Sequence, residues 1–270
     1  MINYIIYKHL NAASSTQPIN WVTFIHGAGG SSSIWYRQIK AFRAHYNVLI
    51  VDLRGHGGSK TIIDEHRGKY NFKIVTQDVL DVLDFLEISK SHFVGISLGT
   101  IIIRQLADMR PNMVSSMILG GAILKLNLQA QLLMTFGNTF KYICPYILLY
   151  QILAFTIMPR KNHRNSRLKF VNEARKMCQK EFIRWFGLTL EVNGLLVTFK
   201  ETIKIPTYYI MGDEDYMFLP YVKKVAENAD KNADEHIKLT IVEKCGHVVN
   251  IDQAKIFNNL SLSFLKTLIL

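Results

Sequence analysis

Six short runs of apolar and β-branched residues recur along this chain of 270 residues, and most are separated by segments with helical spacing. The runs are Trp21–Ile25, Val48–Val51, His92–Ile96, Met117–Leu119, Thr207–Met211 and Lys238–Val242. Continuous apolar runs are typical of strands buried on both faces, as in a parallel sheet. Between two of them, Val75, Val79 and Leu83 predict the apolar face of a helix over residues 72–86. Alternating strands and helices predict a doubly wound α/β fold with a mostly parallel sheet.

The alternation is interrupted once, between residues 124 and 204. This segment has no strand pattern, and its apolar and basic residues have helical spacing. We therefore predict a core formed by residues 1–123 and 205–270, with a helical insertion at residues 124–204 between the sixth and seventh strands. Sites in open parallel sheets lie beyond the carboxyl ends of the strands, so we expect the insertion to cover the site as a lid.

Composition excludes several classes of protein. A chain with 49% hydrophobic residues is not disordered, and three cysteines without C-x-x-C spacing do not form a disulfide framework. The first ten residues lack the pattern of a secretory signal and predict a strand at Ile2–Tyr7. The longest apolar stretch, residues 143–158, is shorter than the roughly 20 residues that cross a bilayer, which favours a core or lid helix. We expect a cytoplasmic protein.

The net charge of +11 is concentrated in the insertion. Residues 124–206 hold 13 basic and four acidic side chains, a net charge of +9. Nucleic acid binding is disfavoured because no recognition motif accompanies these bases. Two interpretations remain, a solvated outer face of the insertion or a patch that attracts anionic lipid or a negatively charged substrate group.

The segment Gly95-Ile96-Ser97-Leu98-Gly99 fits the pattern G-x-S-x-G, with an apolar strand before it and a helical pattern after it. Glycines on both sides permit the tight turn that exposes a nucleophilic serine, here Ser97. A serine needs a base and an orienting acid. His247, after the last apolar run, is the candidate base. Asp215 is the preferred acid, and Asp213 is the second choice.

A glycine-rich loop, His26 to Gly30, follows another predicted strand. Its backbone can point an amide toward an oxyanion, so Ala28 and Leu98 are the predicted oxyanion donors. The loop lacks the lysine of a P-loop and the spacing G-x-G-x-x-G, which disfavours nucleotide binding. We expect neither a cofactor nor a metal.

Together these motifs resemble those of the α/β-hydrolase fold superfamily over essentially the whole chain. The matching segments are His26–Gly29, Asp52–Ser59, Gly95–Gly99, Gly212–Asp215 and Gly246-His247. The family's acid usually stands three residues after a glycine such as Gly212, which supports Asp215. Epoxide hydrolases and haloalkane dehalogenases carry aspartate at the position of Ser97, so the resemblance disfavours both groups. It also implies structural roles for Asp52 and His56.

The resemblance implies a serine hydrolase that cleaves a small or medium apolar ester, thioester or lactone through an acyl-enzyme. We expect Gly27, Trp35, Phe136 and Val248 to contact the substrate; Trp35 matches an aromatic residue that packs near the pocket in relatives. The many apolar side chains of the insertion are expected mostly to pack on the core, or in part to line an acyl pocket.

Other functions remain open at this point. An aminopeptidase, a cofactor-free peroxidase or a lyase would keep the same three residues. A peripheral membrane lipase and a non-enzymatic ligand receptor are further alternatives, and a weak contact of the insertion with a membrane surface is one of the partner hypotheses. The oligomeric state has no signal in the sequence.

Overall fold

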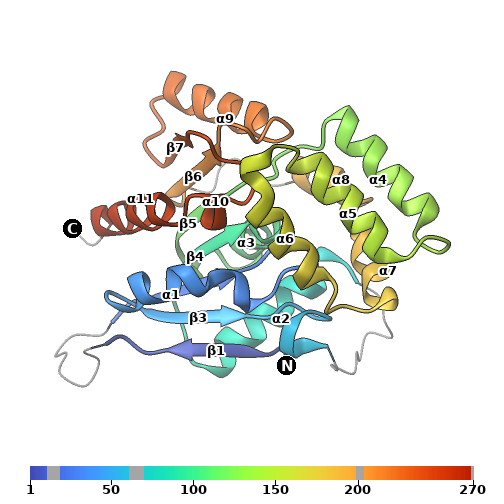
Figure 1. Ribbon diagram of the computed structural model, residues 1–270. Helices are drawn as coiled ribbons and strands as arrows, with labels where there is room; N and C mark the ends of the chain where they lie inside the picture. The colour runs from blue at the N-terminus through green and yellow to red at the C-terminus, as the bar shows by residue number, and fades with distance from the viewer. Residues whose placement is uncertain (11–18, 61–69, 199–203, 269–270) are drawn as a thin grey trace.

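The core of the protein is a seven-stranded sheet in a computed structural model that describes residues 1–10, 19–60, 70–198 and 204–268 (Figure 1). The strands are β1 (Tyr4–Tyr7), β2 (Trp21–Ile25), β3 (Asn47–Val51), β4 (Ser91–Ile96), β5 (Val114–Gly120), β6 (Thr207–Gly212) and β7 (Ile237–Val242). Their order is β1-β3-β2-β4-β5-β6-β7, and only β1 runs antiparallel to its neighbour. The predicted α/β fold with a mostly parallel sheet is confirmed.

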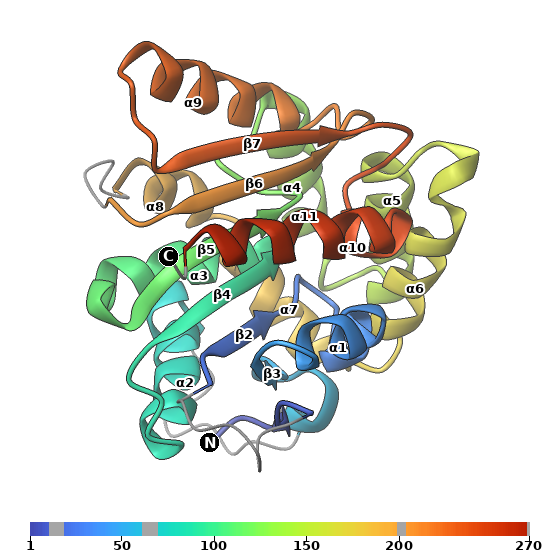
Figure 2. The same cartoon turned by 90° about the vertical axis from the view of Figure 1, so that its left-hand side faces the viewer.

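Helices cover both faces of this sheet (Figure 2). On one face lie α1 (Tyr36–Arg43), α10 (Val249–Asp252) and α11 (Ala254–Thr267); on the other lie α2 (Phe72–Phe85), α3 (Leu98–Met109) and α9 (Leu219–Lys231). Side chains alternate along a strand, so Val48 and Ile50 of β3 join the first layer while Leu49 and Val51 join the second. Burial on both faces explains why these strands are continuously apolar.

The insertion consists of α4 (Leu128–Phe140), α5 (Tyr146–Ile157), α6 (Arg164–Ala174), α7 (Gln179–Leu188) and α8 (Val192–Thr198). The helical prediction for this segment matches these helices, but its position in the strand count is corrected. The insertion lies between β5 and β6, not between a sixth and a seventh strand, because β1 alone precedes β2 in the described part of the chain.

Local signals explain where these helices begin. The side chain of Asn127 accepts a hydrogen bond from the Ala130 amide at 2.7 Å and caps α4, as Asn71 caps α2 through the Ile74 amide at 2.8 Å. Pro145 precedes α5, where a missing amide hydrogen costs nothing. Within the described residues, no helix has the length and apolar character needed to cross a membrane.

Candidate active site

Ser97 occupies a sharp turn between β4 and α3. Its backbone has φ 53° and ψ −123°, a conformation that costs energy for a non-glycine residue. A Cβ at Gly99 would lie 2.3 Å from the carbonyl oxygen of Ile25, and one at Gly95 would lie 2.5 Å from the side chain of Ile103. The two glycines therefore let the turn sit against neighbouring backbone, and the turn lifts the Ser97 hydroxyl above the end of the strand.

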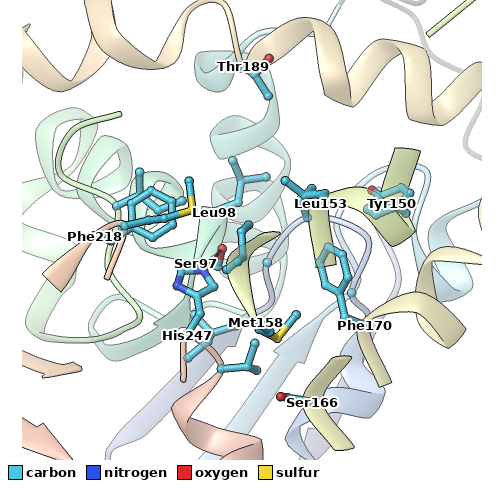
Figure 3. A pocket seen from close by; sticks show the side chains of 18 of the residues that line it. Ser97, Leu98, Tyr150, Leu153, Met158, Ser166, Phe170, Thr189, Phe218 and His247 are labelled. Carbon is cyan, nitrogen blue, oxygen red and sulfur yellow. Dashed lines mark hydrogen bonds between the residues drawn. The ribbon is translucent and has the colours of Figure 1, made fainter. Parts of the chain in front are cut away.

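The other two predicted residues, Asp215 and His247, reach Ser97 from the loops after β6 and β7. The His247 Nε2 atom lies 2.8 Å from the Ser97 Oγ atom (Figure 3). The Nδ1 atom of the same ring lies 2.8 Å from Asp215 Oδ2. Asp215 follows β6, His247 follows β7, and both side chains are buried. The structure thus joins a hydroxyl, an imidazole and a carboxylate in one hydrogen-bonded chain.

The geometry also separates Asp215 from its two acidic neighbours. Asp213 Oδ1 accepts the backbone amide of Cys245 at 3.1 Å and so holds the loop that leads to His247. Glu214 points the other way, toward the insertion. Of these three acidic residues, Asp215 alone is bonded to the imidazole, and Asp213, the second choice from the sequence, has a structural contact.

Two buried histidines hold the predicted oxyanion loop. His26 accepts the amide of Leu53 through Nε2 at 3.0 Å, and His56 accepts the amide of Gly29 through Nε2 at 3.0 Å. The opposite ring nitrogens then donate to the carbonyl oxygens of Gly27 and Arg54. Burial lowers the pKa of His26 and lowers that of His56 to about 3, so both rings are neutral at pH 7. These bonds fix the backbone on either side of Ala28.

A cavity of about 130 Å³ opens beside Ser97 and His247. The core contributes to its wall Gly27 and Val248, expected from the sequence to contact substrate, and Ala28 and Leu98, expected to be the oxyanion donors. The insertion contributes residues from several of its helices, of which Tyr150, Leu153 and Phe170 are labelled in Figure 3 on the side of the cavity away from Phe218. The insertion therefore forms much of the wall around the reacting groups.

Two predicted substrate contacts are wrong. Trp35 is fully buried in the layer of α1 and α11, where its ring lies 4.8 Å from that of Phe24, and its neighbour Ile34 reaches the cavity instead. Phe136 lies on the outer face of α4, 44% exposed, with its ring 4.6 Å from Phe140. The helical repeat places Ala130 and Met134 on the cavity side and turns Phe136 away from it.

Comparison with known proteins agrees with this architecture. A family model described as the alpha/beta hydrolase fold matches residues 20–145. The crystal structure of an enol-lactonase from Burkholderia xenovorans LB400 superposes with a TM-score of 0.76 at 19% identity and covers 98% of this chain and 96% of its own. The chain has the α/β-hydrolase fold.

Two other proteins are similar to this chain over nearly the full length. RutD of Acinetobacter baylyi, whose name describes a carbamate hydrolase, is 26% identical over 98% of each chain. The solved structure of Est816, described as an N-acyl homoserine lactone degrading enzyme, has a TM-score of 0.74 at 20% identity and covers 97% of this chain and 96% of its own.

Several residues of this hydrolase-fold site have no motif that could have revealed them. The Phe218 ring lies 5.0 Å from the His247 ring, and Tyr150 packs against Gly29 of the oxyanion loop. Glu173 is a buried carboxylate of the cavity wall, bonded by Ser31 at 2.7 Å and by Lys169 at 3.0 Å. Tyr150 and Glu173 belong to the insertion, and Phe218 lies in the loop after β6. The sequences of these segments do not show which of their side chains face the cavity.

A second polar group, the Glu214 cluster (Arg160, Asn162, His163 and Glu214), ties the insertion to the loops of the acid and the base. Glu214 accepts hydrogen bonds from Arg160 at 2.5 Å, His163 at 2.6 Å and Asn162 at 2.7 Å. Burial raises the pKa of Glu214, but these bonds outweigh burial and leave the pKa below its usual value. The His163 ring also packs against Gly246, the residue before His247.

Proposed function

We propose that this protein is a serine hydrolase that forms an acyl-enzyme on Ser97. The observation that carries the proposal is the chain of 2.8 Å hydrogen bonds from Ser97 through His247 to Asp215. The match to the alpha/beta hydrolase fold model and the hydrolase names of similar proteins support the same class of reaction.

In the proposed reaction, Ser97 attacks the carbonyl carbon of the substrate while His247 Nε2 takes the hydroxyl proton. Asp215 orients the imidazole through Nδ1 and stabilises its positive charge. The amides of Ala28 and Leu98 donate to the oxyanion, and the imidazolium then protonates the leaving group. Water, deprotonated by His247, attacks the acyl carbon, and collapse of this second intermediate releases the acid and restores Ser97.

The cavity supports an apolar acyl group of limited length. Its wall is formed mainly by aliphatic and aromatic side chains, and its one buried carboxylate, Glu173, is already paired with Lys169 and Lys176. A protein cavity of about 150 Å³ accommodates benzene, so about 130 Å³ suits a group of roughly five or six carbons. We therefore propose a small-to-medium ester or an acyl lactone as substrate. One structural neighbour is described as an enol-lactonase and another as an N-acyl homoserine lactone degrading enzyme, which agrees with this class.

The choice of acid is tested with two matched substitutions. We expect Asp215→Asn to lower kcat by about 10⁴-fold, because the amide cannot hold the productive imidazole tautomer. Asp213→Asn keeps the Oδ1 acceptor for Cys245 and is expected to change kcat by less than about tenfold. Equal losses in both variants would refute the assignment of Asp215.

The nucleophile and the substrate class are tested together. Ser97→Ala is expected to abolish fluorophosphonate labelling and to lower hydrolysis of p-nitrophenyl esters by several orders of magnitude. With the unmodified protein, the rate is expected to rise from acetate to hexanoate esters. Labelling without multiple turnover would indicate a receptor, and a flat chain-length series would contradict the acyl cavity.

A carbamate is the second candidate substrate, because RutD is similar over 98% of both chains. A carbamate places an amino group on the carbonyl carbon, where the cavity wall offers mostly apolar atoms. Ethyl carbamate in the same assay panel separates the two classes. A higher kcat/KM for the carbamate than for ethyl butyrate would replace the ester proposal.

A further inference from the structure

One part of the insertion is almost free of charge. Residues 126–159 include helices α4 and α5 and contain a single charged side chain, Lys141. Such a segment is expected to be buried, since long uncharged helices normally pack into a core. The expectation that these apolar side chains mostly cover the core is only partly met.

The outward side of the α4–α5 hairpin is apolar and exposed. Nine large apolar side chains form this surface, which we call the apolar crest: Leu128, Leu132, Phe136, Phe140, Tyr142, Ile143, Leu148, Ile152 and Phe155. Leu128 is 72% exposed, Leu132 is 63% exposed and Ile143, in the turn between the helices, is 80% exposed. None of the nine lines the cavity, so the proposed reaction does not account for them. A cluster of exposed apolar residues of this kind marks an interaction surface.

A basic helix lies directly beside the apolar crest. Helix α6 packs along α5, as Figure 1 shows, and the segment that leads into it is also basic. The exposed cations of this region, here called the basic flank, are Arg160, Lys161, Arg164, Arg175 and Lys176. Apolar side chains next to a basic border have the polarity of a segment that lies in the interface of an anionic bilayer.

We propose that the apolar crest and the basic flank dock this protein on the surface of a membrane that contains anionic lipid. The crest side chains enter the boundary between headgroups and acyl chains, and the flank lies against lipid phosphates. This inference goes beyond the proposed hydrolysis and does not depend on it.

Charge favours a lipid surface over a second copy of the chain. A twofold contact through the crest would bring together two insertions that each have a net charge of +9. The positive charges of the two insertions would repel each other, whereas an anionic lipid surface would neutralise them. The opposite sides of α4 and α5 carry Met134 and Leu153 in the cavity wall. Docking would therefore place the roof of the cavity at the membrane, where apolar esters partition.

Co-sedimentation with vesicles tests the proposal. We expect the full chain and Ser97→Ala to bind equally to phosphatidylglycerol–phosphatidylcholine vesicles, and both to bind at least about tenfold more weakly to pure phosphatidylcholine. Because binding is measured on the inactive variant as well, failure of the proposed hydrolysis and failure of docking are distinguishable.

Variants of the crest give the sharper result. The combined substitution Leu128→Gln, Leu132→Gln and Ile143→Gln is expected to weaken binding to the anionic vesicles by at least about tenfold. Phe85→Gln is the matched control, because Phe85 is 63% exposed but lies on α2, outside the crest. Thermal unfolding midpoints of both proteins check that the fold is retained.

Charge reversal tests the flank separately. Lys161→Glu with Arg164→Glu is expected to weaken binding by about tenfold or more, whereas Lys223→Glu with Lys224→Glu on α9 changes the net charge equally and is expected to have a much smaller effect. Equal binding to neutral and anionic vesicles, or equal losses in crest and control variants, would overturn the proposal. So would a crest-dependent dimer in analytical ultracentrifugation without vesicle binding.

Discussion

Replacing His56 with phenylalanine removes two buried hydrogen bonds while keeping an aromatic ring. The His56 side chain is fully buried, and its ring contacts Trp185 at 4.8 Å and His26 at 4.9 Å between centroids. In the variant, the amide of Gly29 loses its partner, whereas the carbonyl of Arg54 keeps the 2.9 Å bond from the Trp185 indole. An unpaired buried group costs about 1–3 kcal/mol, and only the Gly29 amide is left unpaired, so we expect a loss of about 1–3 kcal/mol in the free energy of unfolding at pH 7.5.

This loss is expected to shrink in acid. Burial lowers the pKa of His56 from 6.5 to about 3, so between these values the unfolded chain binds a proton that the folded protein does not bind. The free energy of unfolding contributed by this group therefore falls as the pH drops below 6.5. At pH 5 the unmodified protein has lost about 2 kcal/mol through His56, at 1.36 kcal/mol for each pH unit. The phenylalanine variant has no such loss, so its deficit is expected to be about 2 kcal/mol smaller at pH 5 than at pH 7.5.

Urea denaturation of both proteins at pH 7.5 and pH 5 measures this difference directly. The other buried histidines, His26, His92, His163 and His247, are present in both proteins and cancel in the comparison. His45→Gln is the surface control, and we expect it to change the free energy of unfolding by no more than about 0.5 kcal/mol. An equal deficit of His56→Phe at the two pH values would refute the inference that His56 stays neutral in the folded protein.

Three further substitutions probe the contacts of the insertion and the cavity. Trp185→Phe removes the 2.9 Å bond from the indole to the Arg54 carbonyl and is expected to lower the free energy of unfolding by about 1–3 kcal/mol in urea denaturation. Gly29→Ala places a Cβ 2.8 Å from the Tyr150 ring at φ +67°, so we expect fluorophosphonate labelling to slow and the melting temperature to fall. Ala130→Phe fills part of the cavity and is expected to lower the rate on hexanoate esters about tenfold or more, relative to acetate, in a steady-state assay.

The residues that the sequence predicted well are those with a local geometric requirement. Ser97 needs glycines on both sides because its turn touches neighbouring backbone, and this requirement is visible as G-x-S-x-G. The acid and the base follow strands that end at the same edge of a parallel sheet, so Asp215 and His247 could be placed near Ser97 from chain order. The parallel sheet brings the three side chains to one edge, where they form the two hydrogen bonds of 2.8 Å.

The sequence predicted that the insertion is helical, but not which side of each helix faces the cavity. Helix α5 is apolar on all sides, so its periodicity does not distinguish Leu153, which reaches the cavity, from Phe155, which is 59% exposed. The same ambiguity led to the wrong prediction for Phe136 on α4. Trp35 was misplaced for a different reason: a short 3₁₀ helix at Ser32–Trp35 turns Ile34 toward the cavity and Trp35 toward the core.

The Glu214 cluster has a consequence for engineering and for divergence among proteins with this fold. Glu214 precedes Asp215 in the chain, yet its three bonded partners, Arg160, Asn162 and His163, all belong to the insertion. A chimaera that replaced residues 124–204 with helices from another hydrolase would exchange the cavity wall and also remove the groups that hold this loop. Transplanting a new specificity onto this scaffold therefore requires residues 160–163 to be kept. In proteins that carry a different insertion, we expect the residue at the position of Glu214 to change together with the residues at positions 160–163.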